Sequence, residues 1–553
     1  MRVASIPLAL CGCLFLVGLG CKSSGGDGGT GGSVGSAGTN GGSAGTSGSA
    51  GTSGAGTAGT NGGSAGTNGG SAGTNGGSAG TNGGSAGTNG GSAGTNGGRG
   101  GTSGGRGGST GAGGTGTTSC TFTPTATTSS KIGSVGIVTW STTLSGVTEA
   151  HIDFGLTTSY GMTAPVDLTQ ASYRTLLLGM KASKTYHYRI EASGGSSTCT
   201  SGDYTIATGP QPNGMVKPMV TTKNKSALYG GFLITGQFIM NVGSSGAPAY
   251  ILDTDGDFVW WYNDGNDATG VRMSYDGKYM WINNANVVFG NTPDSPHVHR
   301  VTMDGLTDTD FSTPFAKLSH QITPLPDGSV AFYTTGANGC DDIKLFPAGG
   351  TPTSSATTLV NAKTAHGGTG ACHLNNIEYS PSDDTLVFSD LDNNCLTKVS
   401  RTTGATVWVL NGGINGIMSS FTGDTWLGGE HGFHILGLDD FVIFNNNSGG
   451  GANPSGGPSN GTGKGSIAIE MKLNLTAKTA TKTWSYTANP GLTVDVLGDV
   501  QRLPNGNTIV DYATLGEIQE VDASGNVLQD LSTSGTNFGY IEKRATLYGP
   551  SPR

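Results

Sequence analysis

Short runs in which apolar and polar residues alternate dominate the chain after residue 119 and predict strands. Residues 136–140 read Gly-Ile-Val-Thr-Trp, and residues 150–155 and 186–190 show the same alternation. A period of two is typical of half-buried strands, and turn residues between such runs at short spacing are typical of a β-sandwich. We therefore predict a small β-sandwich over residues 119–208.

A weaker repeat of strand, turn and strand fills the chain from residue 217 to residue 549. One series of turns recurs at intervals of about 50 to 65 residues, and a second series lies between its members. Two hairpins in each unit of about 50 residues predict the four-stranded blades of a propeller. A first unit at 229–235 lacks the turn but completes a count of six. The turns are centred on Asp276, Asp327, Asp383, Asp439 and Asn505 in the first series, and on Asp255, Asp304, Thr403 and Ser524 in the second.

The predicted fold class is therefore all-β, a six-bladed β-propeller preceded by a small β-sandwich. Before both lies a long Gly-rich segment, residues 22–118, built from Gly, Ser, Thr, Asn and Ala. Its unit GTNGGSA recurs every seven residues but offers no apolar position for a coiled coil. Such a segment cannot offset its ordering entropy, so we expect a disordered tether with a root-mean-square reach of roughly 50–60 Å.

The first residues indicate export. Arg2 precedes an apolar stretch, residues 6–19, which is too short to span a bilayer and is followed by Gly20 and Cys21. Cys21 resembles the lipidation cysteine of bacterial lipoproteins, so we expect residues 1–21 to be a lipoprotein signal and the protein to reach a membrane through a lipid anchor. The residue after the cysteine is lysine, which resembles the pattern for the outer membrane or cell surface of a Gram-negative bacterium. The alternative is an ordinary cleaved signal with an incidental cysteine.

Charge and cysteine content narrow the function further. Only 12% of the residues are charged, the formal net charge is -9 and no basic run exists, which argues against nucleic acid as a partner. Export favours disulfides. We expect Cys120 to pair with Cys199, because the two ends of the sandwich must lie close. One further disulfide is expected among Cys340, Cys372 and Cys395, and the sequence does not show which two of them form it. No spacing typical of a zinc site is present, and we expect no metal.

Three histidines open the predicted inner strands of successive blades: His320, His373 and His431. Inner strands begin near the axis of a propeller, so the three imidazoles are expected to converge there as a candidate site. The alternative is three unrelated surface histidines. The run Asn445-Asn446-Asn447, with the glycine-rich residues 448–465 after it, is interpreted as a mobile loop beside the His431 strand.

Four segments together resemble the bacterial arylsulfate sulfotransferase family: residues 320–333, 373–412, 431–446 and 498–508. The resemblance implies a small β-sandwich followed by a six-bladed propeller. It also implies transfer of a sulfonate from an aryl sulfate to a phenol through a sulfohistidine, without a cofactor. It places His431 at the attacking position and His373 and His320 at oxyanion-binding positions. Residues 178–189 separately resemble the tyrosine-corner strand of fibronectin type III domains.

One departure from the family concerns charge. The family has an arginine in the strand after the His373 position, and the matching residue here is Leu391, between Asp390 and Asp392. Losing a bidentate cation beside carboxylates disfavours an anionic substrate. Three hypotheses follow: another cation compensates, the substrate differs, or the protein is a non-catalytic propeller that binds a glycan or a protein. The compensating residues would be His297, His299 or Arg300.

Calcium is a separate possibility for three of the aspartates, Asp255, Asp390 and Asp392, because oxygen-rich loops suit this ion. No EF-hand or related spacing is present. We therefore interpret these residues as solvated turn residues.

Overall fold

The computed structural model describes residues 120–238, 246–284, 297–335, 339–368, 371–411, 416–419, 429–447 and 465–550. These residues fall within one compact unit, Thr110–Arg553. The predicted signal, Cys21 and the glycine-rich tether lie outside the described residues. Within the described ranges, no helix is both long and apolar enough to cross a membrane.

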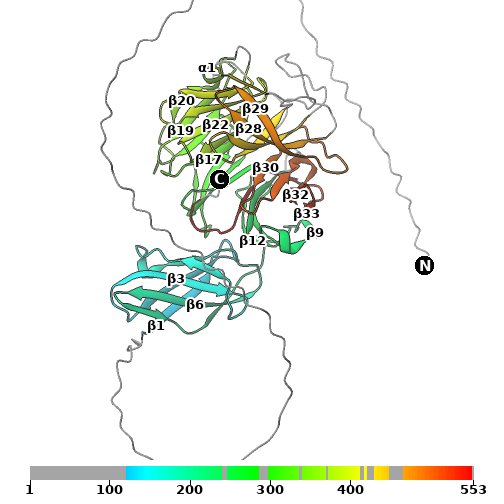
Figure 1. Ribbon diagram of the computed structural model, residues 1–553. Coiled ribbons are helices and arrows are strands. Elements are labelled where there is room, and N and C mark those ends of the chain that lie inside the picture. Colours follow the sequence, from blue (N-terminus) through cyan, green and yellow to red (C-terminus); the bar gives the residue numbers. More distant parts are fainter. Residues whose placement is uncertain are drawn as a thin grey trace, which may run out of the picture. The chain divides into compact units, whose positions relative to one another are not determined.

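The first part of the described chain is a sandwich of two antiparallel sheets (Figure 1). Its longest strand, β6, alternates buried and partly exposed residues along its length, as its sequence pattern predicts. The inward residues Trp140, Ile152, Phe154 and Ile190 are at most 2% exposed and form its core. One sheet contains β1 (Phe122–Thr128), β2 (Gly136–Thr142) and β5 (Thr175–Leu177), and the other contains β3 (Val147–Gly155), β4 (Met162–Pro165), β6 (Thr185–Gly194), β7 (Ser197–Thr200) and β8 (Tyr204–Ala207).

Two local contacts stabilise this sandwich. Cys120 and Cys199 form a disulfide with Cα atoms 6.0 Å apart, which is the pairing expected from the sequence. The backbone N–H of Lys181 donates to the hydroxyl oxygen of Tyr186 at 2.8 Å, a contact of the tyrosine-corner type.

The remaining strands form six blades (Figure 1). Blade 1 contains β10 (Phe232–Phe238), β11 (Ala249–Asp253), β12 (Phe258–Tyr262), β34 (Asn537–Phe538) and β35 (Glu542–Arg544). Blade 2 contains β13 (Gly270–Met273), β14 (Tyr279–Asn284), β15 (His297–Thr302) and β16 (Asp308–Asp310). Blade 3 contains β17 (Leu318–Pro324), β18 (Val330–Thr334), β19 (Asp342–Phe346) and β20 (Thr357–Asn361). Blade 4 contains β21 (Leu374–Ser380), β22 (Thr385–Asp390), β23 (Cys395–Ser400) and β24 (Thr406–Leu410). Blade 5 contains β26 (Glu430–Ile435), β27 (Asp440–Asn445), β28 (Ile467–Asn474) and β29 (Thr479–Tyr486). Blade 6 contains β30 (Asp499–Arg502), β31 (Thr508–Asp511), β32 (Glu517–Val521), β33 (Val527–Ser532) and β9 (Met219–Thr222).

A few short elements connect these blades. β25 (Gly416–Ser419) pairs in parallel with both β24 and β29, and so joins blades 4 and 5. The described helices are short, and none belongs to a blade. They are α1 (Ala362–His366), η1 (Ala171–Tyr173), η2 (Lys225–Ala227) and η3 (Ala513–Leu515).

Both ends of the propeller segment close the ring. β35 and β34, near the C-terminus, pair with β10, and β9, at the start of the segment, pairs with β33. The inner strands of blade 1 therefore come from the far end of the chain and are not joined to β10 by a turn. This explains why the first unit of the sequence repeat lacks the Asp or Asn turn that marks the others.

Apolar faces between neighbouring blades form the propeller core. β18 and β22 are buried at every position, because neighbouring blades cover both of their faces. One cluster joins blades 2 and 3 around Trp281 and Phe332, and another joins blades 4 and 5 around Trp408 and Phe441. This stacking of blades on one another holds the inner strands, and the residues they carry, in fixed positions.

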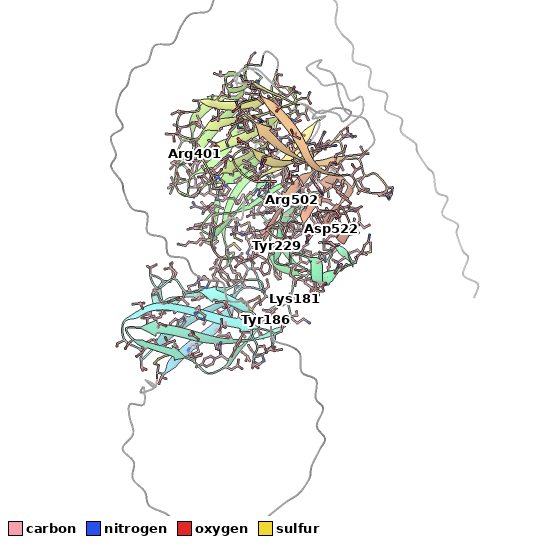
Figure 2. All side chains as sticks on the ribbon, in the orientation of Figure 1. Lys181, Tyr186, Tyr229, Arg401, Arg502 and Asp522 are labelled. Atoms are coloured by element: carbon pink, nitrogen blue, oxygen red, sulfur yellow. A yellow bond between two sulfur atoms is a disulfide. The ribbon has the colours of Figure 1, made fainter. Side chains whose placement is uncertain are left out.

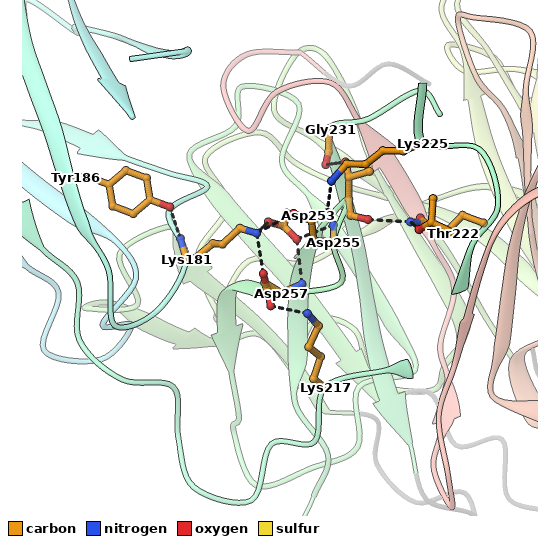
Figure 3. A network of polar contacts seen from close by, with 11 residues as sticks. Lys181, Tyr186, Lys217, Thr222, Lys225, Gly231, Asp253, Asp255 and Asp257 are labelled. Atoms are coloured by element: carbon orange, nitrogen blue, oxygen red, sulfur yellow. Dashed lines mark hydrogen bonds and ion pairs between the residues drawn. The ribbon is translucent and has the colours of Figure 1, made fainter. Parts of the chain in front are cut away.

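The sandwich contacts blade 1 through a charged network (Figure 3). The Lys181 ammonium lies 2.9, 3.0 and 2.7 Å from the carboxylates of Asp253, Asp255 and Asp257. Lys217 and Lys225 each add a further contact of 2.6 Å to this group. Hydrogen bonds from Lys225 and Lys181 lower the pKa of Asp255 to about 2. Although these three carboxylates lie close enough to hold a metal ion, an ammonium lies among them and supplies the opposite charge.

A second disulfide lies in the propeller. It joins Cys340 to Cys372, with Cα atoms 4.4 Å apart, while the thiol of Cys395 is free and buried. This identifies the pair that the sequence left open. Because Cys372 directly precedes His373, the disulfide also fixes the chain at the start of β21.

Candidate functional site

The inner strands of blades 3, 4 and 5 share a local irregularity where they begin. The regular pairing of each strand is interrupted just before Ile322, Ile377 and Phe433, respectively. His320 and His431 each lie two residues before the point where pairing resumes. At a β-bulge the extra residue is unpaired, and its side chain is directed differently from those of the regular ladder.

Blade 4 differs from the expected equivalence of three histidines. The position that corresponds to His320 and His431 is occupied by Asn375, and His373 lies two residues earlier. His320 and His431 are 8% and 3% exposed, whereas His373 is exposed. The sequence pattern predicts equivalent positions for the three histidines, because it shows only where each strand begins. It does not show the offset of two residues in blade 4.

The three imidazoles nevertheless come together. The ring centroid of His320 lies 5.6 Å from that of His373 and 6.1 Å from that of His431. Three blades that are separated by more than fifty residues in the sequence thus contribute one ring each. The histidine cluster, by which we mean His320, His373 and His431, is the candidate site.

His431 is held by a buried amide. Its Nδ1 atom lies 2.7 Å from Oδ1 of Asn446, which directly follows β27. Burial lowers the pKa of His431 to about 4, although the hydrogen bond to Asn446 acts in the opposite direction. His431 is therefore a neutral imidazole at pH 7. The next residue, Gly432, permits the close approach of blade 6, because a Cβ atom there would lie 2.0 Å from Oδ1 of Asp499.

His320 is also neutral. Burial, and then the positive charge that its neighbours His373 and His431 carry when protonated, lower the pKa of His320 well below its usual value. Its backbone has a φ of 46°, a left-handed conformation that is uncommon for a residue other than glycine. Its Nδ1 atom lies 2.8 Å from the hydroxyl of Ser319.

His373 is fixed through its backbone. Its N–H donates to Oδ1 of Asp390 at 3.1 Å, and its carbonyl accepts from the N–H of Leu391 at 2.9 Å. His366 supports Asp390 with a contact of 3.0 Å between Nε2 and Oδ2. Gly368 donates to the other ring nitrogen of His366 at 2.8 Å, so that the proton of His366 lies on Nε2, facing Asp390.

Side chains of other blades bind the backbone carbonyls near the interrupted pairing. Asn283 of β14 donates to the carbonyl of His320 at 2.8 Å, and Asn375 donates to the carbonyl of Glu430 at 2.6 Å. Tyr540 donates to the carbonyl of Asn375 at 2.6 Å. A buried carbonyl without a partner is costly, so these bonds stabilise the irregular strands. The sequence does not reveal these roles of Asn283, Asn375 and Tyr540, because nothing in the local pattern shows which blades bring their residues together.

One interpretation from the sequence was wrong at its first residues. The sequence predicts a mobile loop at Asn445, Asn446 and Asn447, but all three are 0% exposed, and Asn445 is the last residue of β27. A run of three asparagines resembles a loop in composition. Here their amides instead bind buried backbone groups, for example Nδ2 of Asn447 to the carbonyl of Gly465 at 2.8 Å. Most of the glycine-rich run that follows lies outside the described residues.

The three residues considered as replacements for the missing arginine lie on β15, the third strand of blade 2, and not on an inner strand. His299 contacts Asp308 at 2.8 Å, and Arg300 lies over the rings of Tyr279 and Phe311. His297 is exposed at the start of the strand. None of the three shares a described contact with the histidine cluster, and that they supply a positive charge to it stays a prediction.

The partners of Arg401, which is labelled in Figure 2, are two aspartates and not the histidine cluster. Arg401 pairs with Asp384 at 2.6 Å and with Asp327 at 2.7 Å, at the turns that end the inner strands of blades 4 and 3. Arg401 itself directly follows β23, at the turn that leads to β24.

Two buried carboxyl groups lie beside the histidines: Glu430 directly precedes His431, and Asp341 accepts a hydrogen bond from the N–H of Leu374, the residue after His373. Burial raises the pKa of Glu430, and the nearby Asp390 and Asp392 raise it further. Burial also raises the pKa of Asp341 to about 7, with Asp390 contributing. Burial thus favours the uncharged form of Glu430 beside His431.

Comparison with known proteins finds a family model that matches part of this site. Residues 355–540, about a third of the chain, match the family model described as arylsulfotransferase (ASST). The matched range includes His373, Asn375, Leu391, His431 and Asn446. This match shows that residues 355–540 are similar to arylsulfotransferases, and it supports a sulfotransferase-like function in general terms. No curated protein matches the chain.

Several solved structures also match, at low similarity. A protein of unknown function from Bacteroides caccae is 14% identical, with a TM-score of 0.35, covering 56% of this chain and 98% of that chain. TolB from Acinetobacter baumannii is 10% identical, with a TM-score of 0.36, covering 66% and 81%. The β-propeller domain of Cps50 (Swd1) from Myceliophteria thermophila is 11% identical, with a TM-score of 0.35, covering 59% and 93%. Similarities at this level carry no argument about activity.

Proposed function

We propose that the protein transfers a sulfonate group from an aryl sulfate to a phenol, with His431 as the nucleophile. The observation that carries this proposal is the state of His431 inside the matched family segment. It is a buried, neutral imidazole whose Nδ1 atom faces Asn446. A neutral imidazole is a good nucleophile near pH 7 and forms covalent intermediates.

The reaction has two steps. In the first, the lone pair of the His431 Nε2 atom forms a bond to sulfur while the bond from sulfur to the aryl oxygen breaks. The donor phenolate leaves with the bonding electrons and takes a proton from solvent. In the second, the oxygen of an acceptor phenol attacks sulfur, the nitrogen–sulfur bond returns its electrons to Nε2, and the phenolic proton passes to solvent.

His320 and His373 are proposed to stabilise the sulfonate oxygens during both steps. Their rings lie close together, and the ring of His320 lies close to that of His431. His320 is neutral and acts as an N–H donor, because its Nδ1 atom can accept from the Ser319 hydroxyl while Nε2 carries the proton. Donors placed where charge shifts are among the largest contributions to catalysis.

The experiment that tests the proposal is covalent trapping. Incubating the protein with a chromogenic aryl sulfate and quenching at alkaline pH is expected to leave an acid-labile sulfonate on the peptide that contains His431. Adding an excess of a second phenol before quenching is expected to remove the label and yield the sulfated phenol. If several aryl sulfates give neither label nor released phenol, the protein is not a sulfotransferase of this kind.

The residue at position 391 gives an independent prediction. The backbone N–H of Leu391 donates to the carbonyl of His373, so the backbone at position 391 lies next to the histidine cluster. An arginine at this position would therefore add a positive charge near the cluster. If an anionic sulfonate binds there, Leu391→Arg is expected to raise kcat/KM for aryl sulfates about tenfold to a hundredfold, the usual range for one hydrogen bond to a charged group. Leu391→Gln is the uncharged control. A lower kcat/KM in the arginine variant would show that the sulfonate does not bind beside His373.

A second candidate function is a non-catalytic propeller that binds a glycan or a protein partner. The observation that favours it is the acidic surrounding of His373, with Asp390 bonded to its backbone and Leu391 in place of a cation. Absence of a covalent label together with saturable binding of a neutral glycan would support this function.

The location of the protein is also a proposal. We propose that Cys21 is lipidated and that residues 22–118 tether the folded part to the outer membrane or cell surface of a Gram-negative bacterium. Cys21→Ser is expected to move the protein from the membrane fraction to the soluble fraction, whereas Cys13→Ser is expected to leave it in the membrane fraction. Unchanged membrane partition of the Cys21 variant would contradict lipidation.

A further inference from the structure

We infer that Asn446 is a positioning residue that fixes the tautomer and orientation of His431, so that the Nε2 atom presents its lone pair to the substrate. The catalytic consequence, attack on sulfur by Nε2 of His431, rests on the proposed function. The geometry behind the inference involves only described residues. Asn446 follows β27, the strand that pairs with β26, which carries His431. It is 0% exposed.

The orientation of the Asn446 amide follows from its partners. Its Nδ2 atom lies 2.9 Å from the carbonyl oxygen of Val494 and 2.8 Å from that of Leu497. A carbonyl oxygen only accepts hydrogen bonds, so the amide must direct its two N–H groups at these two atoms. The Oδ1 atom therefore faces His431 and acts only as an acceptor.

The ring of His431 has to match that acceptor. Its Nδ1 atom lies 2.7 Å from Oδ1 of Asn446, a distance that requires a proton between the two atoms. In a neutral imidazole only one nitrogen carries a proton, so Nε2 is left with a free lone pair. Nucleophilic attack on sulfur requires this tautomer.

The backbone of Asn446 is fixed as well. Its N–H donates to the carbonyl of Gly429 at 3.1 Å, and its carbonyl accepts from the Ser466 hydroxyl at 3.0 Å. The Ser466 hydroxyl in turn accepts from the N–H of Val494 at 3.0 Å. Asn446 is thus connected to the strand that carries His431 and to the segment before β30, and it cannot rotate without breaking several buried bonds.

An amide at this position has a different effect from a carboxylate. A carboxylate facing Nδ1 would stabilise the protonated ring and raise the pKa of His431. The amide orients the ring without adding charge, so the ring stays neutral. The titratable groups around His431 are the His320 and His373 rings and Glu430 on its own strand, while Asp499 from β30 packs against Gly432.

The test reads the tautomer directly and does not depend on turnover. Protein labelled with ¹⁵N-histidine is examined by long-range ¹H–¹⁵N correlation NMR, and the His431 signals are assigned by comparison with His431→Gln. We expect the wild type to show a proton on Nδ1 and a free Nε2 from pH 6 to pH 8. In Asn446→Leu we expect a mixture of the two tautomers. In Asn446→Asp we expect a protonated ring that titrates at higher pH than in the wild type.

Kinetics with an aryl sulfate gives the second measurement. Asn446→Leu is expected to lower kcat about tenfold to a hundredfold with little change in KM. Asn446→Asp is expected to move the acidic limb of the pH profile of kcat/KM to higher pH. The matched control is Asn447→Asp, because Asn447 is an adjacent buried amide that binds Gly465. This control should leave the His431 signals and the pH profile unchanged.

The outcomes separate this inference from the proposed function. A proton on Nε2 in the wild type, or wild-type tautomer and kcat in Asn446→Leu, would overturn the role of Asn446 even if the enzyme is active. Conversely, a protein that shows the predicted tautomer but transfers no sulfonate would retain the geometric inference and lose the proposed function.

Discussion

Replacing His431 with alanine is expected to abolish both the covalent sulfonate label and the release of phenol from an aryl sulfate. His431 is proposed to form the bond to sulfur. It lies in β26 where the regular strand pairing is interrupted, two residues before Phe433. Loss of a covalent nucleophile typically lowers kcat by several orders of magnitude, and we expect about 10⁴-fold or more. The measurements are peptide mass spectrometry of the trapped protein and the rate of phenol release.

A matched variant separates chemistry from folding. His187→Ala removes an imidazole in the sandwich, where His187 pairs with Asp203 at 2.8 Å, and is expected to keep full activity. Thermal unfolding of both variants checks that each one folds. Label found in His431→Ala at the wild-type level would place the nucleophile elsewhere.

Replacing His320 or His373 with alanine is expected to produce the second largest effect. Each ring is proposed to donate a hydrogen bond to the sulfonate oxygens, and loss of one such donor commonly costs about 10²–10³ in kcat. The label on His431 should still form, but more slowly. Rapid-quench measurements of label formation and removal test both steps.

The neutral state of His320 makes this prediction more specific. A neutral N–H donor can be replaced by an amide, so His320→Asn is expected to recover part of the activity lost in His320→Ala. If only a cationic side chain such as lysine recovers activity, His320 acts as a charge and not as a neutral donor. Equal activity of wild type and His320→Ala would remove His320 from the site.

Acid stability offers a check on the same residues that does not involve substrate. The pKa of His431 is about 4 in the folded protein, below its usual value, so the unfolded state binds more protons than the folded state between these values. Stability therefore falls as the pH decreases from about 6.5 towards 4, by about 3 kcal/mol for this residue at most. The variant without His431 should lose less stability over that pH range than the wild type.

The repeat in the sequence was sufficient to predict six blades, because each blade repeats the same alternation of strand and turn. Turn residues such as Asp276, Asp327 and Asn505 lie where inner strands turn back, as predicted. The exception, blade 1, lacks its turn because the ring closes through β35. Closure between two chain ends leaves no local pattern, so the sequence showed only the count.

For the site, the sequence by itself determined that three histidines begin the inner strands of successive blades, since strand starts and residue types are local properties. Only the tertiary structure decided what those histidines can do. The offset of His373 by two residues, the Asn446 amide facing His431 and the placement of Arg300 over Tyr279 and Phe311 all depend on which strand packs beside which. Burial and hydrogen bonds between segments far apart in the sequence set the charge of each imidazole, and neither is encoded in the residues next to it.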